Sequence, residues 1–436
     1  MKTRYATTYR RLIHSWADNI ISLLDVFSAF LQTRLAPAVN GVTRRFPRIA
    51  EFFKNLTPKK LFAFLCMVSV LSQIDFLSEI WLVRAAVILL WFMAFLFFAA
   101  KSRLKLQRET LFFLCPILIF DLLTFLTGLV KGNLSGYLCS PITYSANLSA
   151  FVFLTGSLAG AVSGKKLILT GAKVYVLCAI FISIYTIITS FSGIWLSAET
   201  YVYSRKNSLA PIILTAVCCI MFLKIIKNVK LNTLLLVLFI GFMVLLKSRA
   251  SIIGLAAALV VWYVCVIKNR RKRLYIIIAV LLAVLLVLVI PALRELVIGN
   301  IIFNNRASLG VNEITSGRSE QFTLIFLANF PNAPFFGSGS TYIESLPLAA
   351  LLSFGVVSAL PLLIFAAVPL RTATLFKNGP VPKSYVLFLK AASIAFLINC
   401  LFEERAPFGP GITYFFLWFT SGFFIGCKKN LSVSIR

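Results

Sequence analysis

The sequence predicts an all-α membrane protein, a helix bundle that crosses the bilayer about twelve times. Hydrophobic residues make up 60% of its 436 residues, and its mean hydropathy is +0.93. The apolar residues form runs of about 20, the length needed to span a hydrocarbon core of about 30 Å. Lys and Arg number 43 against 14 Asp and Glu, and the basic residues cluster between the runs. Apolar runs joined by basic connections are typical of a polytopic bundle.

The first 60 residues differ from the rest of the chain. They carry many basic residues, and apolar residues such as Leu12, Trp16 and Ile20 recur at helical spacing. The pattern predicts a cytoplasmic amphipathic arm over residues 1–60, which either lies on the membrane surface or packs against the bundle. Residues 61–436 are predicted to form one transmembrane domain.

Twelve apolar segments follow the arm. They lie near 61–79, 82–100, 110–130, 144–163, 168–191, 208–226, 231–247, 250–267, 274–293, 346–370, 384–402 and 412–427. Lys and Arg concentrate in every second connection, as the positive-inside rule requires if those connections are cytoplasmic. This alternation predicts that both termini are cytoplasmic.

Composition and motifs exclude several classes of function. Nucleic-acid binders gather basic charge on one solvated face, whereas here the short connections share it, so we expect no nucleic-acid partner. The sequence has no Walker loop and no dinucleotide fingerprint. Its one histidine, His14, lies in the arm, and no DxD-like acid pair offers a divalent metal site. We therefore expect neither a metal nor a cofactor.

The longest outer connection, about 294–345, is expected to carry function because loops of this length are seldom plain linkers. Within it, Arg318 follows a Ser-Gly turn at a predicted helix start, where its guanidinium and free N–H groups could hold phosphate oxygens. Arg249 lies between two spans with no polar loop, where burial of its charge is costly unless an anion pairs with it. Two such Arg forks suit a pyrophosphate. The competing interpretations are snorkelling to the headgroups for Arg249 and a solvated loop charge for Arg318.

Further candidates lie at the outer ends of other spans. Glu403, Glu404 and Arg405 stand in a short turn stiffened by Pro and Gly, where a carboxylate suits a general base and the arginine offsets its charge or meets the substrate. Ordinary loop solvation is the alternative. Arg205 and Lys206 add basic groups that either bind an anion or lie at the interface. Secondary candidates in the outer connection are Glu320, Glu344 and Arg306.

Three motifs follow one another on the predicted outer side. They are LLKSRASIIGL at 245–255, SGRSEQF at 316–322 followed by PFFGSGS, and LFEERAPFGPG at 401–411. In this order they resemble the O-antigen polymerase and O-antigen ligase superfamily, and the similarity of topology extends from about residue 61 onward. The resemblance implies a bacterial inner-membrane enzyme with about twelve spans and a large periplasmic loop. Ligases are expected to carry a His in that loop, where this chain has Glu344 or Ser345, so the resemblance favours the polymerase branch (Wzy type).

The resemblance implies a metal-independent, GT-C-like glycosyltransferase that polymerises O-antigen or capsule repeat units. Its donor would be a glycan chain on undecaprenyl pyrophosphate, and its acceptor the terminal sugar of a new lipid-linked repeat unit. Arg249 and Arg318 would hold the departing pyrophosphate, because charge develops there as the bond breaks. Glu403 or Glu404 would deprotonate the acceptor, ahead of Glu320 or Glu344. The expected partners are the lipid-linked glycans and membrane lipids, with a chain-length regulator as a further candidate.

Two other functions stay open. A ligase would transfer finished polymer to the lipid A core. A flippase or other transporter of anionic lipids would use the same arginines, but it should distribute polar residues through its spans and often carries inverted repeats. Asp75, Asp121 and Lys390 are the clear candidates for such residues, and no inverted repeat is evident.

Overall fold

The computed structural model of this chain describes residues 57–102, 106–195, 206–226, 228–302, 317–339, 341–376, 381–409 and 413–427. Almost all of the predicted arm at 1–60 lies outside these residues, as do Arg205 and Arg306. Every regular element within the described ranges is helical, in agreement with the predicted all-α fold.

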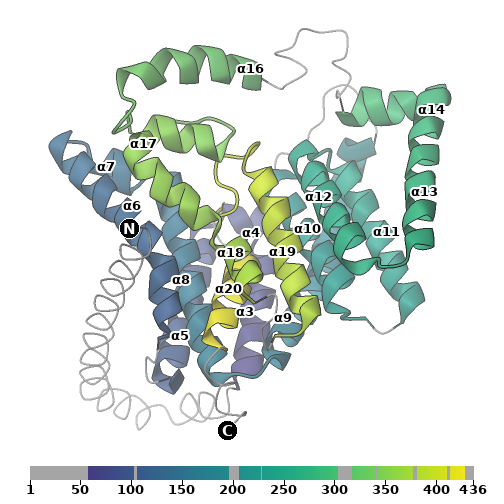
Figure 1. Ribbon diagram of the computed structural model, residues 1–436, viewed down its shortest axis with the longest axis horizontal. Helices are drawn as coiled ribbons and strands as arrows, with labels where there is room; N and C mark the ends of the chain where they lie inside the picture. The colour runs from purple at the N-terminus through teal and green to yellow at the C-terminus, as the bar shows by residue number, and fades with distance from the viewer. Residues whose placement is uncertain are drawn as a thin grey trace, which may run out of the picture.

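The helices pack as a bundle (Figure 1). In chain order they are α3 (Pro58–Leu71), α4 (Asp75–Glu79), α5 (Trp81–Ser102), α6 (Arg108–Val130), α7 (Leu134–Leu138), α8 (Pro141–Val162), α9 (Lys166–Trp195), α10 (Lys206–Leu223), α11 (Val229–Leu245), α12 (Arg249–Val266), α13 (Arg270–Val289), α14 (Pro291–Arg294), the π-helix η1 (Glu295–Ile302), α16 (Arg318–Glu320), the π-helix η2 (Gln321–Leu327), the 3-10 helix η3 (Phe330–Asn332), α17 (Leu346–Ala366), α18 (Val368–Leu375), α19 (Lys383–Asn399) and α20 (Phe415–Gly426). Within the described part of the chain, eight helices are long and apolar enough to cross a membrane.

Each predicted apolar segment contains a helix, but three segments are not single continuous helices. The segment 274–293 is divided at Ile290, because α13 ends at Val289 and α14 begins at Pro291. The segment 61–79 is divided, because α3 ends at Leu71 and α4 begins at Asp75. The segment 346–370 contains α17, in which Gly355 has φ 70° and ψ 172°, outside the helical region. The number of membrane crossings and their sidedness remain predictions.

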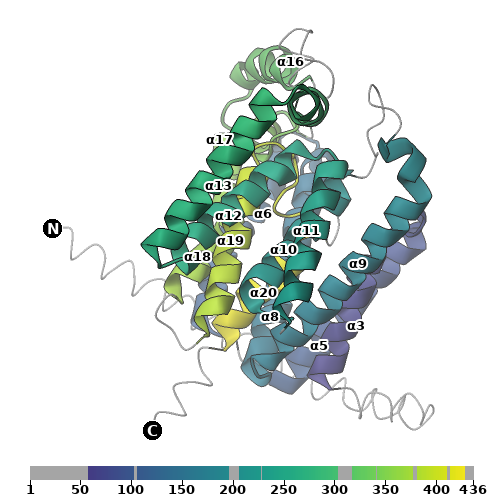
Figure 2. The ribbon, with the colours of Figure 1, turned by 90° about the vertical axis from the view of Figure 1, so that its right-hand side faces the viewer.

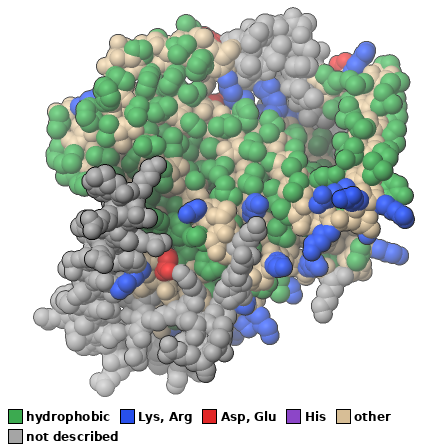
Figure 3. Space-filling view, viewed as in Figure 1, with side chains coloured by type: hydrophobic (Ala, Val, Ile, Leu, Met, Phe, Trp, Pro, Cys, Tyr) green, Lys and Arg blue, Asp and Glu red, His purple; other side chains and the backbone are tan. Residues whose placement is uncertain are grey.

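The surface of the bundle is that of a membrane protein. Apolar side chains cover much of the described surface in Figure 3, and many Lys and Arg side chains lie across its middle and lower part. A broad apolar band bordered by basic groups is expected where a protein passes from hydrocarbon to a charged interface.

Helix α20 lies inside the bundle, and all 12 of its residues are buried. It packs closely against α8 through two facing Gly-xxx-Gly motifs, Gly156 with Gly160 and Gly422 with Gly426. A Cβ at any of these four glycines would overlap the backbone of the facing helix. Glycines at this spacing let two helix backbones approach each other directly, which favours association in a membrane.

Helix α17 is interrupted at Gly355, and the loop 334–339 supplies the hydrogen bonds that the interruption leaves open. On one side of the break, two loop N–H groups donate to α17 carbonyls, and on the other side two α17 N–H groups donate to loop carbonyls. The four bonds run from Ser338 to Leu352 at 2.9 Å, from Gly339 to Ser353 at 3.0 Å, from Val356 to Pro334 at 2.8 Å and from Val357 to Phe335 at 3.2 Å. The loop therefore replaces a missing turn of helix.

The same loop is held from its other side by the connection that follows α6. The hydroxyl of Tyr137 donates to the carbonyls of Phe336 and Gly337, both at 3.1 Å, and the ammonium of Lys131 also donates to the Gly337 carbonyl. Two layers of contacts thus fix the chain just before the segment 341–345.

A short helical segment lies beyond one end of the bundle. It starts at α16, directly after Gly317 with φ 81°, and continues through η2. Both views place it over the end of the bundle to which α17 also belongs (Figures 1 and 2). The predicted helical character of the segment beginning at Arg318 is therefore confirmed.

Candidate active site

Segments that are distant in sequence meet at this end of the bundle. The backbone N–H of Leu346, at the start of α17, donates to the carbonyl of Cys400 at the end of α19 at 2.9 Å. The backbone N–H of Glu344 donates to the Gln321 side-chain carbonyl, which belongs to the helical segment after α16, at 3.0 Å. The segment 341–345 is consequently tied both to the turn after α19 and to the first turns of the outer helix.

Arg318 connects these three parts through its side chain. Its Nη2 lies 2.7 Å from Oε2 of Glu344 and donates to the Phe402 carbonyl at 3.2 Å. Its guanidinium carbon lies 5.9 Å from the centre of the Phe402 ring. Its Nε is buried and has no hydrogen-bond partner. An arginine with an unused, buried N–H can donate to a ligand oxygen, and such binding is favoured because leaving a buried donor unpaired is costly.

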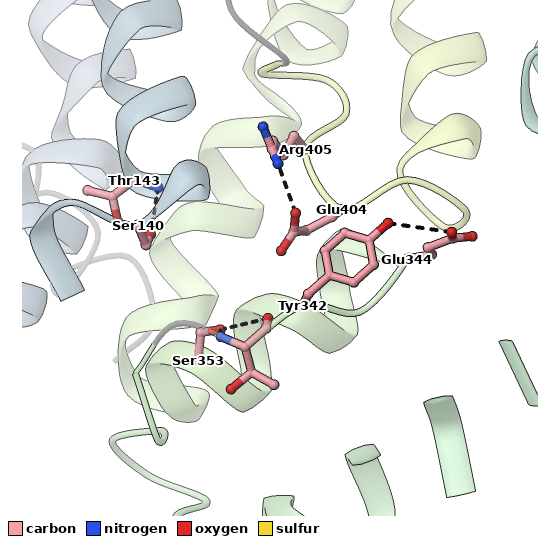
Figure 4. Close-up of polar contacts among 8 residues, drawn as sticks. Ser140, Thr143, Tyr342, Glu344, Ser353, Glu404 and Arg405 are labelled. Carbon is pink, nitrogen blue, oxygen red and sulfur yellow. Dashed lines mark hydrogen bonds and ion pairs between the residues drawn. The ribbon is translucent and has the colours of Figure 1, made fainter. Parts of the chain in front are cut away.

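Tyr342 stands beside the carboxylates of this site. Its hydroxyl donates to Oε1 of Glu344 at 3.4 Å, and Figure 4 draws its ring between Glu344 and Glu404. Burial raises the pKa of Tyr342 to about 12, and the carboxylates of Glu344, Glu404 and Glu403 add to the rise. Tyr342 therefore keeps its proton at neutral pH and serves as a donor.

Glu403 is the carboxylate with the strongest change in acidity. Burial, together with the nearby charge of Glu344, raises its pKa to about 7, although Arg318, Lys206 and Arg405 act in the opposite direction. A carboxylate whose pKa lies near the operating pH is suited to take up and release a proton.

Glu404 is more buried than its neighbours and is paired with the next residue. Its Oε2 accepts from Nε of Arg405 at 3.2 Å (Figure 4). Burial raises the pKa of Glu404, and the hydrogen bond and charge of Arg405 oppose that rise. This internal pairing leaves Glu403 as the better placed base of the two.

Two further cations approach from the starts of α10 and α12. Lys206 interacts electrostatically with Arg249 and Arg318, which carry the same charge, and with Glu403 and Glu344, which carry the opposite charge. Three cations thus share one region with two carboxylates. Like charges held this close favour the binding of an anion among them.

The residues predicted from the sequence are largely brought together. Those in mutual contact or electrostatic range are Lys206, Arg249, Arg318, Glu344, Glu403, Glu404 and Arg405. Glu320 is exposed on α16, and Arg205 and Arg306 lie outside the described residues. Within the described ranges, no group of three or more His, Cys, Asp or Glu side chains is arranged to hold a metal ion.

Sequence reasoning missed two residues that organise the site, Tyr342 and Gln321. Each had a weak signal: Tyr342 lies two residues before Glu344, and Gln321 lies three residues after Arg318, so it shares a helix face with it. Neither position predicts the contact itself, because both contacts depend on how the loop 334–339 returns the chain to α17.

A protein-family model described as O-Antigen ligase matches residues 234–360. The match runs from α11 into α17 and includes Arg249, Arg318 and Glu344. It supports the resemblance to the O-antigen ligase and polymerase superfamily and a role in processing glycans of that kind, without separating ligases from polymerases. A search of curated proteins found no match.

Proposed function

We propose that this chain polymerises lipid-linked polysaccharide repeat units, of O-antigen or capsule, in the bacterial inner membrane. On the periplasmic face it transfers the glycan chain from undecaprenyl pyrophosphate to the terminal sugar of a new lipid-linked unit. The observation that carries the proposal is the gathering of Arg249, Arg318 and Glu403 around Lys206, where Glu403 is a carboxylate with a pKa of about 7. An anion-binding group and a base in one site are the two parts that this transfer needs.

The cations stabilise the leaving group. As the bond between the anomeric carbon and the pyrophosphate oxygen breaks, negative charge grows on the pyrophosphate, and donors already in place stabilise it without reorganisation. Arg318 offers an unpaired Nε for this purpose, and Lys206 lies within electrostatic range of both Arg318 and Arg249. Arginine forks bind phosphate oxygens in pairs, so the site suits a pyrophosphate better than a single carboxylate.

Glu403 completes the reaction as general base. The acceptor hydroxyl gives its proton to the Glu403 carboxylate while its oxygen forms the new bond to the anomeric carbon, and undecaprenyl pyrophosphate leaves with the bonding electrons. Arg405 pairs with Glu404 and is partly exposed, so it is available to meet the acceptor sugar. A positioned base of this kind contributes about 10²–10⁴-fold to a rate.

Ligation of finished polymer to the lipid A core is the second candidate. The description of the matching family favours it, because the family is named for O-antigen ligases. The polymerase is preferred because the only histidine of the chain, His14, lies in the N-terminal arm, whereas the resemblance leads one to expect a histidine in the outer loop of a ligase. In this chain the corresponding region contains Glu344.

The pattern of surface polysaccharide in a deletion strain tests the proposal. A polymerase deletion should leave single repeat units on the lipid A core and abolish the ladder of longer chains. Loss of a ligase should instead leave long polymer on the lipid carrier with none on the core, and loss of a flippase should leave units on the cytoplasmic side. Either of these two outcomes would rule out the polymerase.

A further inference from the structure

The proposed pyrophosphate site is partly filled by the protein itself. Glu344 contacts Arg318 through one carboxylate oxygen and one guanidinium nitrogen, at 2.7 Å, while Nε of Arg318 stays buried and unpaired. A carboxylate that used the full fork would bind two guanidinium nitrogens. Glu344 therefore occupies only one of the positions at which a larger anion would contact Arg318.

The ion pair between Arg318 and Glu344 is also weak enough to be broken by a ligand. The side chains of Arg318 and Glu344 are 27% and 26% exposed, and partly solvated ion pairs are weak because water competes for both charges. A polyanion that offers several oxygens to Arg318 and also meets Lys206 and Arg249 can replace one carboxylate oxygen.

The carboxylate of Glu344 keeps a second hydrogen-bond partner when it leaves Arg318. Its other carboxylate oxygen accepts from the Tyr342 hydroxyl at 3.4 Å, and its backbone N–H is held by Gln321 at 3.0 Å. Rotation of the side chain is sufficient, since the backbone of the segment is fixed by the bond from Leu346 to Cys400.

We propose that Glu344 is an exchangeable internal ligand of Arg318: the donor pyrophosphate displaces its carboxylate, and the carboxylate returns as undecaprenyl pyrophosphate leaves. This role rests on the proposed function and differs from that of a base. Donor and product carry the same pyrophosphate, so a site that bound it without competition would release the product slowly. Competition from Glu344 weakens the binding of both by one common factor, because the ligand binds only the fraction of molecules in which Arg318 is unpaired. The turnover rate increases because the weaker binding lets the product pyrophosphate leave the site faster.

Binding of farnesyl pyrophosphate, a short polyprenyl pyrophosphate, to the purified full chain in detergent tests this role. E344Q keeps the shape of the side chain and removes its charge, so its Kd should fall about 1.5- to 5-fold, the factor that corresponds to the loss of a partly exposed ion pair. E344D keeps the charge but is one methylene shorter, and it should also bind more tightly than the parent because its carboxylate no longer reaches Arg318. E109Q is the matched control. Glu109 lies in the first turn of α6, and Lys131, which contacts the loop 334–339, follows the other end of that helix, about 33 Å away. The Kd of E109Q should equal that of the parent.

These variants distinguish an internal ligand from the other roles that Glu344 could have. A Kd for E344Q equal to or above that of the parent would overturn the proposal and return Glu344 to the substrate-binding or basic residues. Tight binding by E344Q with parental binding by E344D would also overturn it, because the effect would then be repulsion at a distance and not a contact. R318A tests the proposed function separately: if the parent binds farnesyl pyrophosphate and R318A binds it equally well, the anion site itself is wrongly assigned.

Discussion

Gly355 lies directly against the backbone of Phe335, so close that a Cβ at Gly355 would overlap the Phe335 carbonyl group. The contact joins the break in α17 to the loop 334–339, whose continuation carries Tyr342 and Glu344 into the site. The interruption of a membrane helix is therefore the local feature on which the position of these side chains depends.

We expect Gly355→Ala to disrupt the site. The residue has φ 70° and ψ 172°, a region essentially restricted to glycine that costs an L-residue about 1–3 kcal/mol, and the added methyl would also separate the four backbone bonds to the loop. The ladder of long polysaccharide should shorten or disappear, and the thermal unfolding midpoint should fall. Gly132→Ala is the comparison variant, since Gly132 also has a positive φ, 64°, but has open space around it. Equal effects of the two substitutions would show that the contact with Phe335 contributes nothing.

The close contact of α8 with α20 makes a prediction about stability. Gly422→Ala would push a methyl group into the Phe153 carbonyl, and overpacking of this kind costs about 1–3 kcal/mol. Its thermal unfolding midpoint in detergent should therefore fall. Gly241→Ala lies within α11 with nothing near the new methyl, and it should be neutral or stabilising. A parental midpoint for Gly422→Ala would contradict the direct backbone contact.

Removal of either arginine of the anion site should abolish polymerisation. Arg249→Ala and Arg318→Ala each remove a charge that stabilises the leaving pyrophosphate, so we expect the rate to fall about 10²–10³-fold and single-repeat material to remain. Substitution by Lys should restore only part of the activity, because an ammonium lacks the planar fork. Arg84→Ala, in which an arginine bonded to the Glu79 carbonyl is removed, should keep the full ladder. A full ladder from either site variant at normal expression would refute its role.

The pH dependence of the rate should identify the base. Because only the ionised carboxylate accepts a proton, a base with a pKa of about 7 gives a rate that rises with pH through about 7 and then levels. Glu403→Gln should remove this rise and lower the rate about 10²–10⁴-fold. Glu404→Gln should keep it. Initial rates between about pH 5.5 and 9 distinguish the two carboxylates, and a rise near pH 7 that survives in Glu403→Gln would assign the base elsewhere.

Much of the fold could be predicted because membrane helices are marked by composition. Each of the twelve predicted segments contains a helix, since about 20 apolar residues have one stable way to satisfy their backbone in lipid. The break at Gly355 could not be predicted in the same way. Apolar residues surround it on both sides, and the hydrogen bonds that stabilise it come from a loop about 20 residues earlier in the chain.

The candidate site was predictable in its residues and not in its contacts. Arg249 and Arg318 could be singled out because a charged group next to an apolar run is costly to bury and is often functional. Glu403 and Arg405 could be singled out because their charges lie in a short turn stiffened by Pro and Gly. The pairing of Arg318 with Glu344 depends on how α16, α17 and α19 pack together at one end of the bundle. The spacing of these residues along the chain does not predict that packing.

Reconstitution of the purified protein gives the most direct test of the central claim, transfer of a glycan from a lipid pyrophosphate by arginines and a carboxylate. The protein is placed in liposomes with the lipid-linked repeat unit extracted from its own deletion strain, in the presence of a metal chelator, beside Arg318→Ala as the matched variant. We predict glycans of two or more repeats attached to lipid pyrophosphate, one undecaprenyl pyrophosphate released for each new bond, and no such products from Arg318→Ala. The absence of oligomers from folded parent protein, or transfer only after lipid A core is added, would contradict that claim.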